Sequence, residues 1–231
     1  MSFLQPRPPS THDLYGPMHK GLRYALCQML TRLGAADPLD DAAVDRLMIE
    51  LRAQLDLSEH HRENEDRHVH TALEARAPGA SVRMAHAHDV HRLIVDELDV
   101  LIVRTEQAEA RERPKLLKEI YLTFSSYVAE DFAHMAEEEQ VMLPVLQSLF
   151  TDTELQAIED RILADTAPHD MVSGARMMVP AYNRKERFEL LSTVRATAPA
   201  EAFDAILERA VRPLLSKEDW DHLVKILTIT V

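Results

Sequence analysis

The residues of this 231-residue chain that could do chemistry include two histidine–glutamate pairs with the same spacing in two distant segments. His61 is followed four residues later by Glu65, and His134 is followed four residues later by Glu138. On a helix, residues four apart lie on one face about one turn apart, so each pair can present an imidazole and a carboxylate to one metal ion. The pairs are 73 residues apart, which indicates an internal repeat.

A single histidine that opens an aliphatic run precedes each pair, His19 before the first and His88 before the second. Four imidazoles and two carboxylates from four facing helices fit a two-metal site in the core of a helix bundle. This mixture of donors suits iron, manganese or zinc, and it favours iron. The predicted metal ligands are His19, His61, Glu65, His88, His134 and Glu138.

Apolar residues at helical spacing predict four long helices that would position these ligands. The expected ranges are 14–33, 40–77, 81 to the charged stretch before Pro114, and 114–150, with caps at Asp40 and Ser81. Short connections favour an antiparallel four-helix bundle, and no segment indicates a strand. We therefore predict an all-α fold, with an irregular arm at 1–11, the bundle with its di-metal site at 12–150, and additional C-terminal helices at 151–231.

The C-terminal third contains helix-start patterns but no further copy of the metal motif. Thr151 with Glu154 and Asn183 with Glu186 have the capping-box spacing, and Ser216 precedes a last helix. Since no Gly/Ser-rich or Pro-rich linker separates these helices from the rest, they are expected to pack on the bundle. The segment 169–183 could be either a short helix or a loop.

The fourth predicted helix carries its histidine–glutamate pair on an otherwise apolar stripe. His134 and Glu138 are in line with Tyr127, Val141 and Val145, which are expected to face inward. A single pair of this spacing is more often a solvated ion pair than a metal site. A metal-free helical interaction module with structural histidines therefore stays open beside the metal-site hypothesis.

The composition limits the classes of partner and the compartment. A net charge of −13, with no basic block, argues against binding to nucleic acid or to an anionic membrane. No apolar run is long enough to span a membrane, and the N-terminus lacks a signal-peptide pattern, so a cytoplasmic location is expected. The single cysteine, Cys27, excludes an internal disulfide and a thiolate metal site within one chain, and its thiol is expected to be buried.

The two motif segments resemble those of the hemerythrin-like, or HHE cation-binding, four-helix bundles. The stretch H-M-A-E-E-E-Q-V-M-L-P at 134–144 is similar to that family's second metal-binding helix, and H-H-R-E-N-E-D-R-H-V-H-T-A-L-E at 60–74 is similar to its first. The resemblance covers about residues 12–150. It implies a non-haem di-iron centre in which Glu65 and Glu138 bridge the ions and the four histidines are terminal ligands.

The resemblance also implies a small diatomic ligand, O2 or NO, or a reaction with oxidants. The implied roles are sensing, detoxification under stress, or repair of iron–sulfur clusters. The oxygen-carrying branch has a fifth histidine four residues from the single one, whereas Met84 and Arg92 occupy the positions four before and four after His88. This departure argues against simple reversible oxygen carriage and favours redox chemistry.

Several alternatives stay open at this point. His91 competes with His88, because it lies on nearly the same helix face and its offset from His19 is closer to the repeat. His88 is favoured, since its surroundings resemble the family's single-histidine site. A di-metal oxidase or hydrolase could use the same cage, so enzymatic activity is left open, as is the oligomeric state. Five histidines are expected at the surface: His12, His70, His86, His169 and His222.

Overall fold

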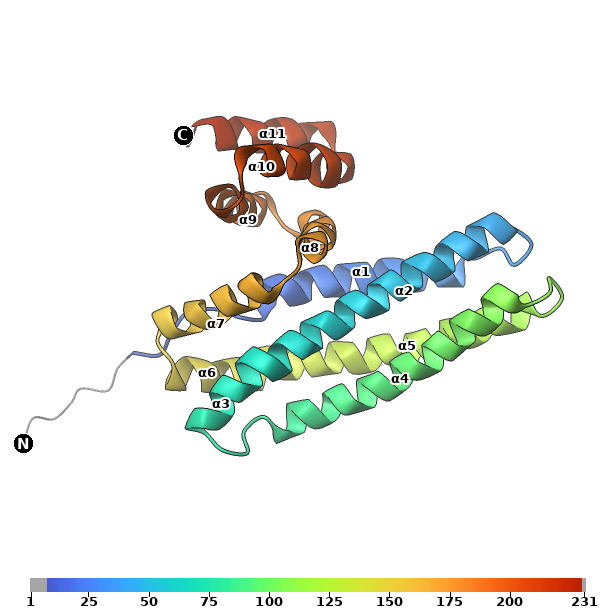
Figure 1. Cartoon of the computed structure of the whole chain (residues 1–231), viewed down its shortest axis with the longest axis horizontal. Helices are drawn as coiled ribbons and strands as arrows, with labels where there is room; N and C mark the ends of the chain where they lie inside the picture. Colours follow the sequence, from blue (N-terminus) through green and yellow to red (C-terminus); the bar gives the residue numbers. More distant parts are fainter. Residues whose placement is uncertain (1–7, 230–231) are drawn as a thin grey trace, which may run out of the picture. The chain divides into compact units, whose positions relative to one another are not determined.

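The computed structural model describes residues 8–229, and every regular element in that range is helical (Figure 1). The contacts between residues separate the chain into two units. The first unit contains the residues up to Gly16 together with Leu26–Asp165, and the second contains Pro17–Ala25 together with the chain from Thr166 onward. The expected all-α class is thus confirmed. Residues 1–7 of the predicted arm lie outside the described range, and residues 8–11 are not helical.

The helix α1 (Gly16–Gly34) contributes to both units. Its second half belongs to the first unit, where a Cβ atom on Gly34 would lie 3.1 Å from the ring of Tyr121 on α5 (Arg113–Glu137). Leu26, Met29 and Leu33 are buried along this half. Cys27 is exposed between them, so the prediction of a buried thiol is wrong; it lies on the face of α1 opposite to the apolar stripe.

The second predicted helix is one helical stretch in three parts: α2 (Asp41–Asn64), the π-helical segment η1 (Glu65–His70) and α3 (Thr71–Arg76). Asp40 caps it as predicted, because its carboxylate accepts a hydrogen bond from the backbone N–H of Ala43 at 2.9 Å. The chain then turns at Gly79, which has a φ of 88°. This positive φ is a conformation that glycine adopts without strain.

The next two helical stretches are antiparallel neighbours. α4 (Val82–Gln107) and α5 (Arg113–Glu137) contact each other along their length and are joined by the short connection 108–112, and α2 contacts α4 (Figure 1). Pro114 lies in the first turn of α5 as predicted. Ser81 precedes α4 but its side chain does not cap it. Its backbone is in the helical region, with φ −91° and ψ −9°, and its hydroxyl and backbone N–H donate to the carboxylate of Glu74.

A π-helical segment, η2 (Glu138–Met142), also interrupts the fourth stretch before it continues as α6 (Leu143–Leu149) with Pro144 in its first turn. A π turn adds one residue to a helical turn and so rotates the residues that follow it. Val141 is therefore 57% exposed and Val145 only partly buried, while Met142 and Leu146 face inward. The inward position predicted for Val141 is wrong for this reason, whereas Val145 packs against the apolar cluster of this unit.

The first unit ends with α7 (Asp152–Asp165), which starts at the predicted capping box. The N–H of Thr151 donates to Glu154 at 2.8 Å, and the N–H of Glu154 donates to the hydroxyl of Thr151 at 3.1 Å. Leu155 and Ile158 of α7 join an apolar cluster with residues that follow the two glutamates. Its buried members are Tyr15, Val69, Leu73, Met84, Met142, Leu146, Phe150, Leu155 and Ile158.

The second unit is built from short helices around its own apolar core. They are α8 (Pro168–Ala181), α9 (Arg184–Thr197), α10 (Ala200–Ile206), the π-helical η3 (Leu207–Val211), the 3-10 turn η4 (Arg212–Leu214) and α11 (Lys217–Ile229). The capping box predicted at Asn183 and Glu186 opens α9. The core consists of Val179, Leu191, Phe203, Val211, Leu223 and Leu227.

Across the described helices of both units, none combines the length and apolarity that a membrane crossing requires. The packing of these helices on a bundle stays a prediction.

Candidate metal centre

Each histidine–glutamate pair lies where an α-helix changes into a π-helical segment. α2 carries His61 and ends one residue before Glu65, and α5 carries His134 and ends one residue before Glu138. π-helical turns inside α-helices are frequent at functional sites. The repeat in the sequence therefore extends to the backbone conformation, although no sequence pattern indicated the π turns.

Glu65 lies between two histidines, with one carboxylate oxygen toward each. Its Oε1 is 3.1 Å from Nε2 of His61, on the same helical stretch, and its Oε2 is 3.4 Å from Nε2 of His88 on α4. The side chain of Glu65 is 3% exposed and that of His88 is fully buried. A carboxylate with its two oxygens toward different imidazoles has the arrangement that a bridge between two cations requires.

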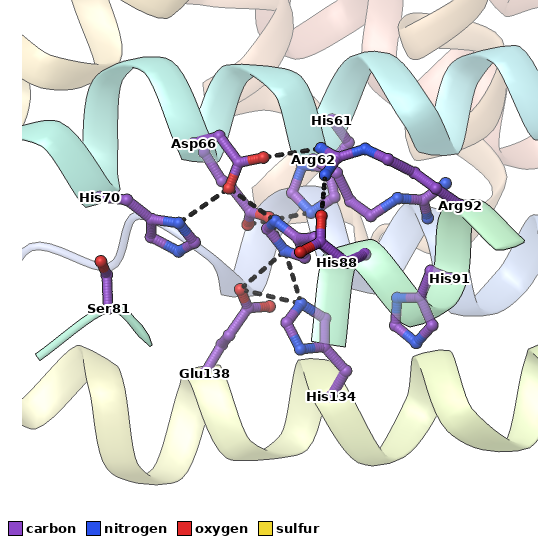
Figure 2. A network of polar contacts seen from close by, with 12 residues as sticks. His61, Arg62, Asp66, His70, Ser81, His88, His91, Arg92, His134 and Glu138 are labelled. Atoms are coloured by element: carbon purple, nitrogen blue, oxygen red, sulfur yellow. Dashed lines mark hydrogen bonds and ion pairs between the residues drawn. The ribbon is translucent and has the colours of Figure 1, made fainter. Parts of the chain in front are cut away.

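Glu138 repeats part of this arrangement from the other side. Its Oε1 is 3.2 Å from Nε2 of His134 and 3.9 Å from Nε2 of His88 (Figure 2). The same nitrogens of His88 and His134 lie 2.9 Å apart. Glu138 is fully buried, and His134 is 6% exposed. The Nε2 atom of His88 thus faces residues of both pairs.

These residues form a buried group that could hold a metal ion. One ligand atom from each of Glu65, His88, His134 and Glu138 lies within 4.8 Å of every other. Two carboxylates and two imidazoles are suitable donors for divalent iron, manganese or zinc, so the residues fit the predicted ion without fixing its identity. Burial of two carboxylates costs several kcal/mol per charge unless cations are close to them, and a divalent ion would supply that charge.

The structure places the other two predicted ligands differently. His61 is next to Glu65 and partly buried, at the edge of the group of four. His19 is fully buried on α1, but it lies in the segment Pro17–Ala25, which belongs to the second unit. Ligation by His19 therefore stays a prediction from the sequence.

His91, the competitor of His88, lies one turn further along α4 and outside the group of four. Its ring is 5.2 Å from that of His134 and 5.9 Å from that of Tyr127, and its Nδ1 is 3.7 Å from Oδ1 of Asp131. Burial lowers the pKa of His91 to about 3, and the positive charges of His134, Arg62 and His88 contribute to the same effect. His91 is thus held as a neutral imidazole beside the centre.

A buried arginine extends the polar interior beyond His91. Arg62 is 1% exposed, and its guanidinium donates to Oη of Tyr127 at 2.8 Å and to Glu59 at 2.8 and 3.1 Å. Burial raises the pKa of Tyr127 to about 12, with a further contribution from Asp131. Tyr127 is a core tyrosine, as the apolar stripe predicted, but nothing in the sequence distinguished Arg62 from a surface arginine.

A second cluster surrounds the outer nitrogen of His88. Asp66 Oδ1 lies 2.8 Å from Nδ1 of His88 and 2.9 Å from Nδ1 of His70, and Asp66 Oδ2 accepts a hydrogen bond from Arg92 at 2.7 Å (Figure 2). His70 is 5% exposed, so its assignment to the surface is wrong. The π turn explains the error, because it brings the residue five positions after Glu65 onto the inner face.

Tyr15 is a further residue near the centre that the sequence gave no reason to select. Its side chain is 1% exposed in the apolar cluster with Val69 and Met142, each four residues beyond one of the glutamates. Burial raises the pKa of the phenol well above its usual value, and the charges of Glu138 and Glu65 raise it further. The phenol therefore stays protonated close to both carboxylates.

Two more histidines of α2 and η1 lie away from the candidate ligands. His60 is exposed, in agreement with its helical position about 100° from His61. His68 is partly buried, and its Nε2 is 3.0 Å from Oδ2 of Asp165 at the end of α7. Neither residue takes part in a group of possible metal ligands in the described chain.

Comparisons with models of protein families, with curated proteins and with solved structures find no match to this chain. The resemblance to hemerythrin-like proteins therefore depends on the motif residues themselves.

Proposed function

We propose that residues 12–150 form an antiparallel four-helix bundle of the hemerythrin-like type that holds two iron ions. Its role is to bind a small diatomic ligand, O2 or NO, or to react with oxidants, in sensing, detoxification or iron–sulfur repair. The observation that carries this proposal is the convergence of two sequence-repeated pairs, 73 residues apart, on the same buried nitrogen of His88.

The six predicted ligands divide into two sets. His88, His134 and Glu138 would hold one ion, and His61 with His19 would hold the other. Glu65 would bridge them, because its two oxygens already lie toward His61 and His88. Glu138 would be the second carboxylate ligand by the family resemblance. Iron in such a shell supplies reversible electron transfer and an open position for a diatomic molecule.

The protein residues around this shell control water and protons. Val69, Leu73 and Met142 cover the side toward Tyr15, which limits access of water to the carboxylates. The phenol of Tyr15 keeps its proton near Glu65 and Glu138. Beside His134, the imidazole of His91 is neutral. The charge of Arg62, which donates to Tyr127, is compensated by Glu59 and Asp131.

The decisive experiment is elemental analysis of anaerobically purified protein, followed by its visible spectrum before and after exposure to air and to NO. We expect two irons per chain and a new charge-transfer band in the visible region. Bound zinc or manganese without such a band would instead support a hydrolytic or structural di-metal site. Protein that takes up no metal, with His61 and His134 intact, would contradict the proposal and favour a metal-free interaction module.

A further inference from the structure

The orientation of His88 is fixed from behind by a carboxylate that is not among the predicted ligands. Asp66 Oδ1 is 2.8 Å from Nδ1 of His88. An ionised carboxylate can only accept hydrogen bonds, so Nδ1 must carry the proton. Nε2 of the same ring then lies on the opposite edge, toward Glu65 and Glu138, where the proposed ion would bind.

Asp66 is in turn held in place by two neighbours. Arg92 donates through Nη2 to Asp66 Oδ2 at 2.7 Å and through Nε to Glu59 at 2.8 Å, so the arginine connects α4 to α2 and η1. His70 lies 2.9 Å from Asp66 Oδ1, and its ring stacks on that of His88 with 5.2 Å between centroids. The carboxylate therefore has a defined position relative to His88.

Asp66 faces hydrogen-bond donors with both of its oxygens. Its Oδ1 lies toward the ring nitrogens of His70 and His88, and its Oδ2 accepts from Arg92. Asp66, His70 and His88 also form a group that could itself hold an ion. The guanidinium of Arg92 lies 2.7 Å from Asp66 Oδ2, and its positive charge disfavours a cation at the same carboxylate, so we assign Asp66 a positioning role instead of ligation.

We propose that Asp66, held by Arg92 and His70, is the positioning residue that keeps the proton of His88 on Nδ1 and presents the lone pair of Nε2 to the metal ion shared with Glu65 and Glu138. The proposal deepens the proposed function and depends on it for the metal. Its part on the proton position concerns the protein alone and can be tested without metal. In known metal sites, loss of a carboxylate in this position weakens metal binding by about 10–100-fold.

The test combines two measurements on the full chain. The first is histidine-selective nitrogen NMR of the metal-free protein, followed to a pH above 9, where Nε2 of His88 should lose its proton while Nδ1 keeps one that exchanges slowly with solvent. The second is the affinity for Zn²⁺, measured by competition with a chelator. The variants are Asp66→Ala, which removes the acceptor, and Asp66→Asn, which keeps an acceptor oxygen without the charge.

The chain offers a matched control in Asp89. Asp89 directly follows His88 in the sequence and also pairs with Arg92, at 3.1 Å, but its side chain is 72% exposed. We expect Asp66→Ala to weaken Zn²⁺ binding by about 10–100-fold, Asp66→Asn by less, and Asp89→Asn to leave it unchanged. In Asp66→Ala the slowly exchanging Nδ1 proton should disappear.

The two proposals fail in different ways. If wild-type protein binds metal and Asp66→Ala binds it as tightly as Asp89→Asn does, the positioning role is wrong while the metal site stands. An unprotonated Nδ1 of His88 in the folded wild type would also overturn it, even if Asp66→Ala does not fold. If wild-type protein binds no metal but shows the protected Nδ1 proton, the proposed function is wrong and only the hydrogen bond between Asp66 and His88 remains.

Discussion

The interiors of the two units differ in what they bury. In the second unit His19 of α1 is buried, but the core formed by the helices from α8 onward is apolar, and a charged residue such as Arg184 stays 47% exposed while it pairs with Glu218 and Asp219. In the first unit, ionisable side chains are buried among the long helices. These are Arg62, Glu65, His70, His88, His91, Asp131, His134 and Glu138.

This difference is the reason why we propose a metal site in the polar interior of the first unit. The first unit also builds an ordinary apolar cluster next to the candidate site, with Leu73, Leu146 and Leu155 fully buried. The same helices could therefore have been filled with apolar residues. Buried charges are costly unless they are paired, and a well-packed apolar core is often more stable than a buried ion pair. Stability alone does not explain these residues.

The largest expected effect is that of Glu138→Gln on metal content. The change removes a fully buried carboxylate, so metal-replete protein should hold fewer than one ion per chain instead of two. Without metal, the variant should be more stable than wild type, because a buried charge is gone. Elemental analysis and thermal unfolding with and without metal measure both effects.

The matched control for this change is Glu137→Gln. Glu137 is the preceding residue and pairs with the exposed Arg83 at 2.8 Å. Equal metal content and equal thermal stability in wild type, Glu138→Gln and Glu137→Gln would contradict a metal site at Glu138. The metal-free interaction module would then be favoured.

The second prediction compares one arginine from each interior. Arg62→Ala leaves Asp131 and Tyr127 without their buried partner, so we expect a loss of about 3–5 kcal/mol in the free energy of unfolding. Arg184→Ala breaks two ion pairs at the surface and should change stability little, since water solvates the remaining carboxylates. Denaturant unfolding of both variants gives the comparison. Similar losses would show that the two interiors do not differ as we infer.

The third and smallest effect is a pH dependence of the free energy of unfolding that comes from His91 in the polar interior of the first unit. The pKa of His91 is about 3 when folded, against about 6.5 when unfolded, so the unfolded chain binds a proton first as pH falls. The stability that neutral His91 provides is present above about pH 6.5 and is lost below it, by up to about 1.4 kcal/mol per pH unit.

The experiment is denaturant unfolding of metal-free protein between pH 6.5 and 5. His91→Gln should make the slope shallower, whereas replacement of the exposed His60 by Gln should not. His88 does not interfere in this range. Burial would lower the pKa of His88, but hydrogen bonds to Asp66 and Glu65 raise it to about 9. The stability that charged His88 provides is therefore fully present below about pH 6.5, and it is lost only as pH rises through 9. An unchanged slope in His91→Gln would contradict the buried neutral state.

Local signals account for what the sequence predicted correctly. The helices follow from apolar spacing, and the caps at Asp40, Thr151 and Asn183 follow from side chains that reach backbone groups two or three residues away. The two histidine–glutamate pairs are local as well, because a helix places residues four apart on one face. These features need no knowledge of the remaining chain.

Interactions between distant segments account for the errors and omissions. Ser81 does not cap α4, since its backbone is in the helical region and its side chain is turned toward Glu74. The burial of His70 and the exposure of Val141 depend on the π turns after Glu65 and Glu138, which have no sequence signature of their own. A one-residue shift of helical register is enough to exchange an inner for an outer face.

The sequence by itself determined the helical class, most helix boundaries and the residues able to bind metal, because periodicity and four-residue spacing act within single helices. Only the tertiary structure decided that His88, and not His91, faces both glutamates, that Asp66 lies behind it, and that Arg62 is buried. These facts depend on how α2, α4 and α5 are rotated against one another. That rotation is set by packing across the whole interior, which no single segment encodes.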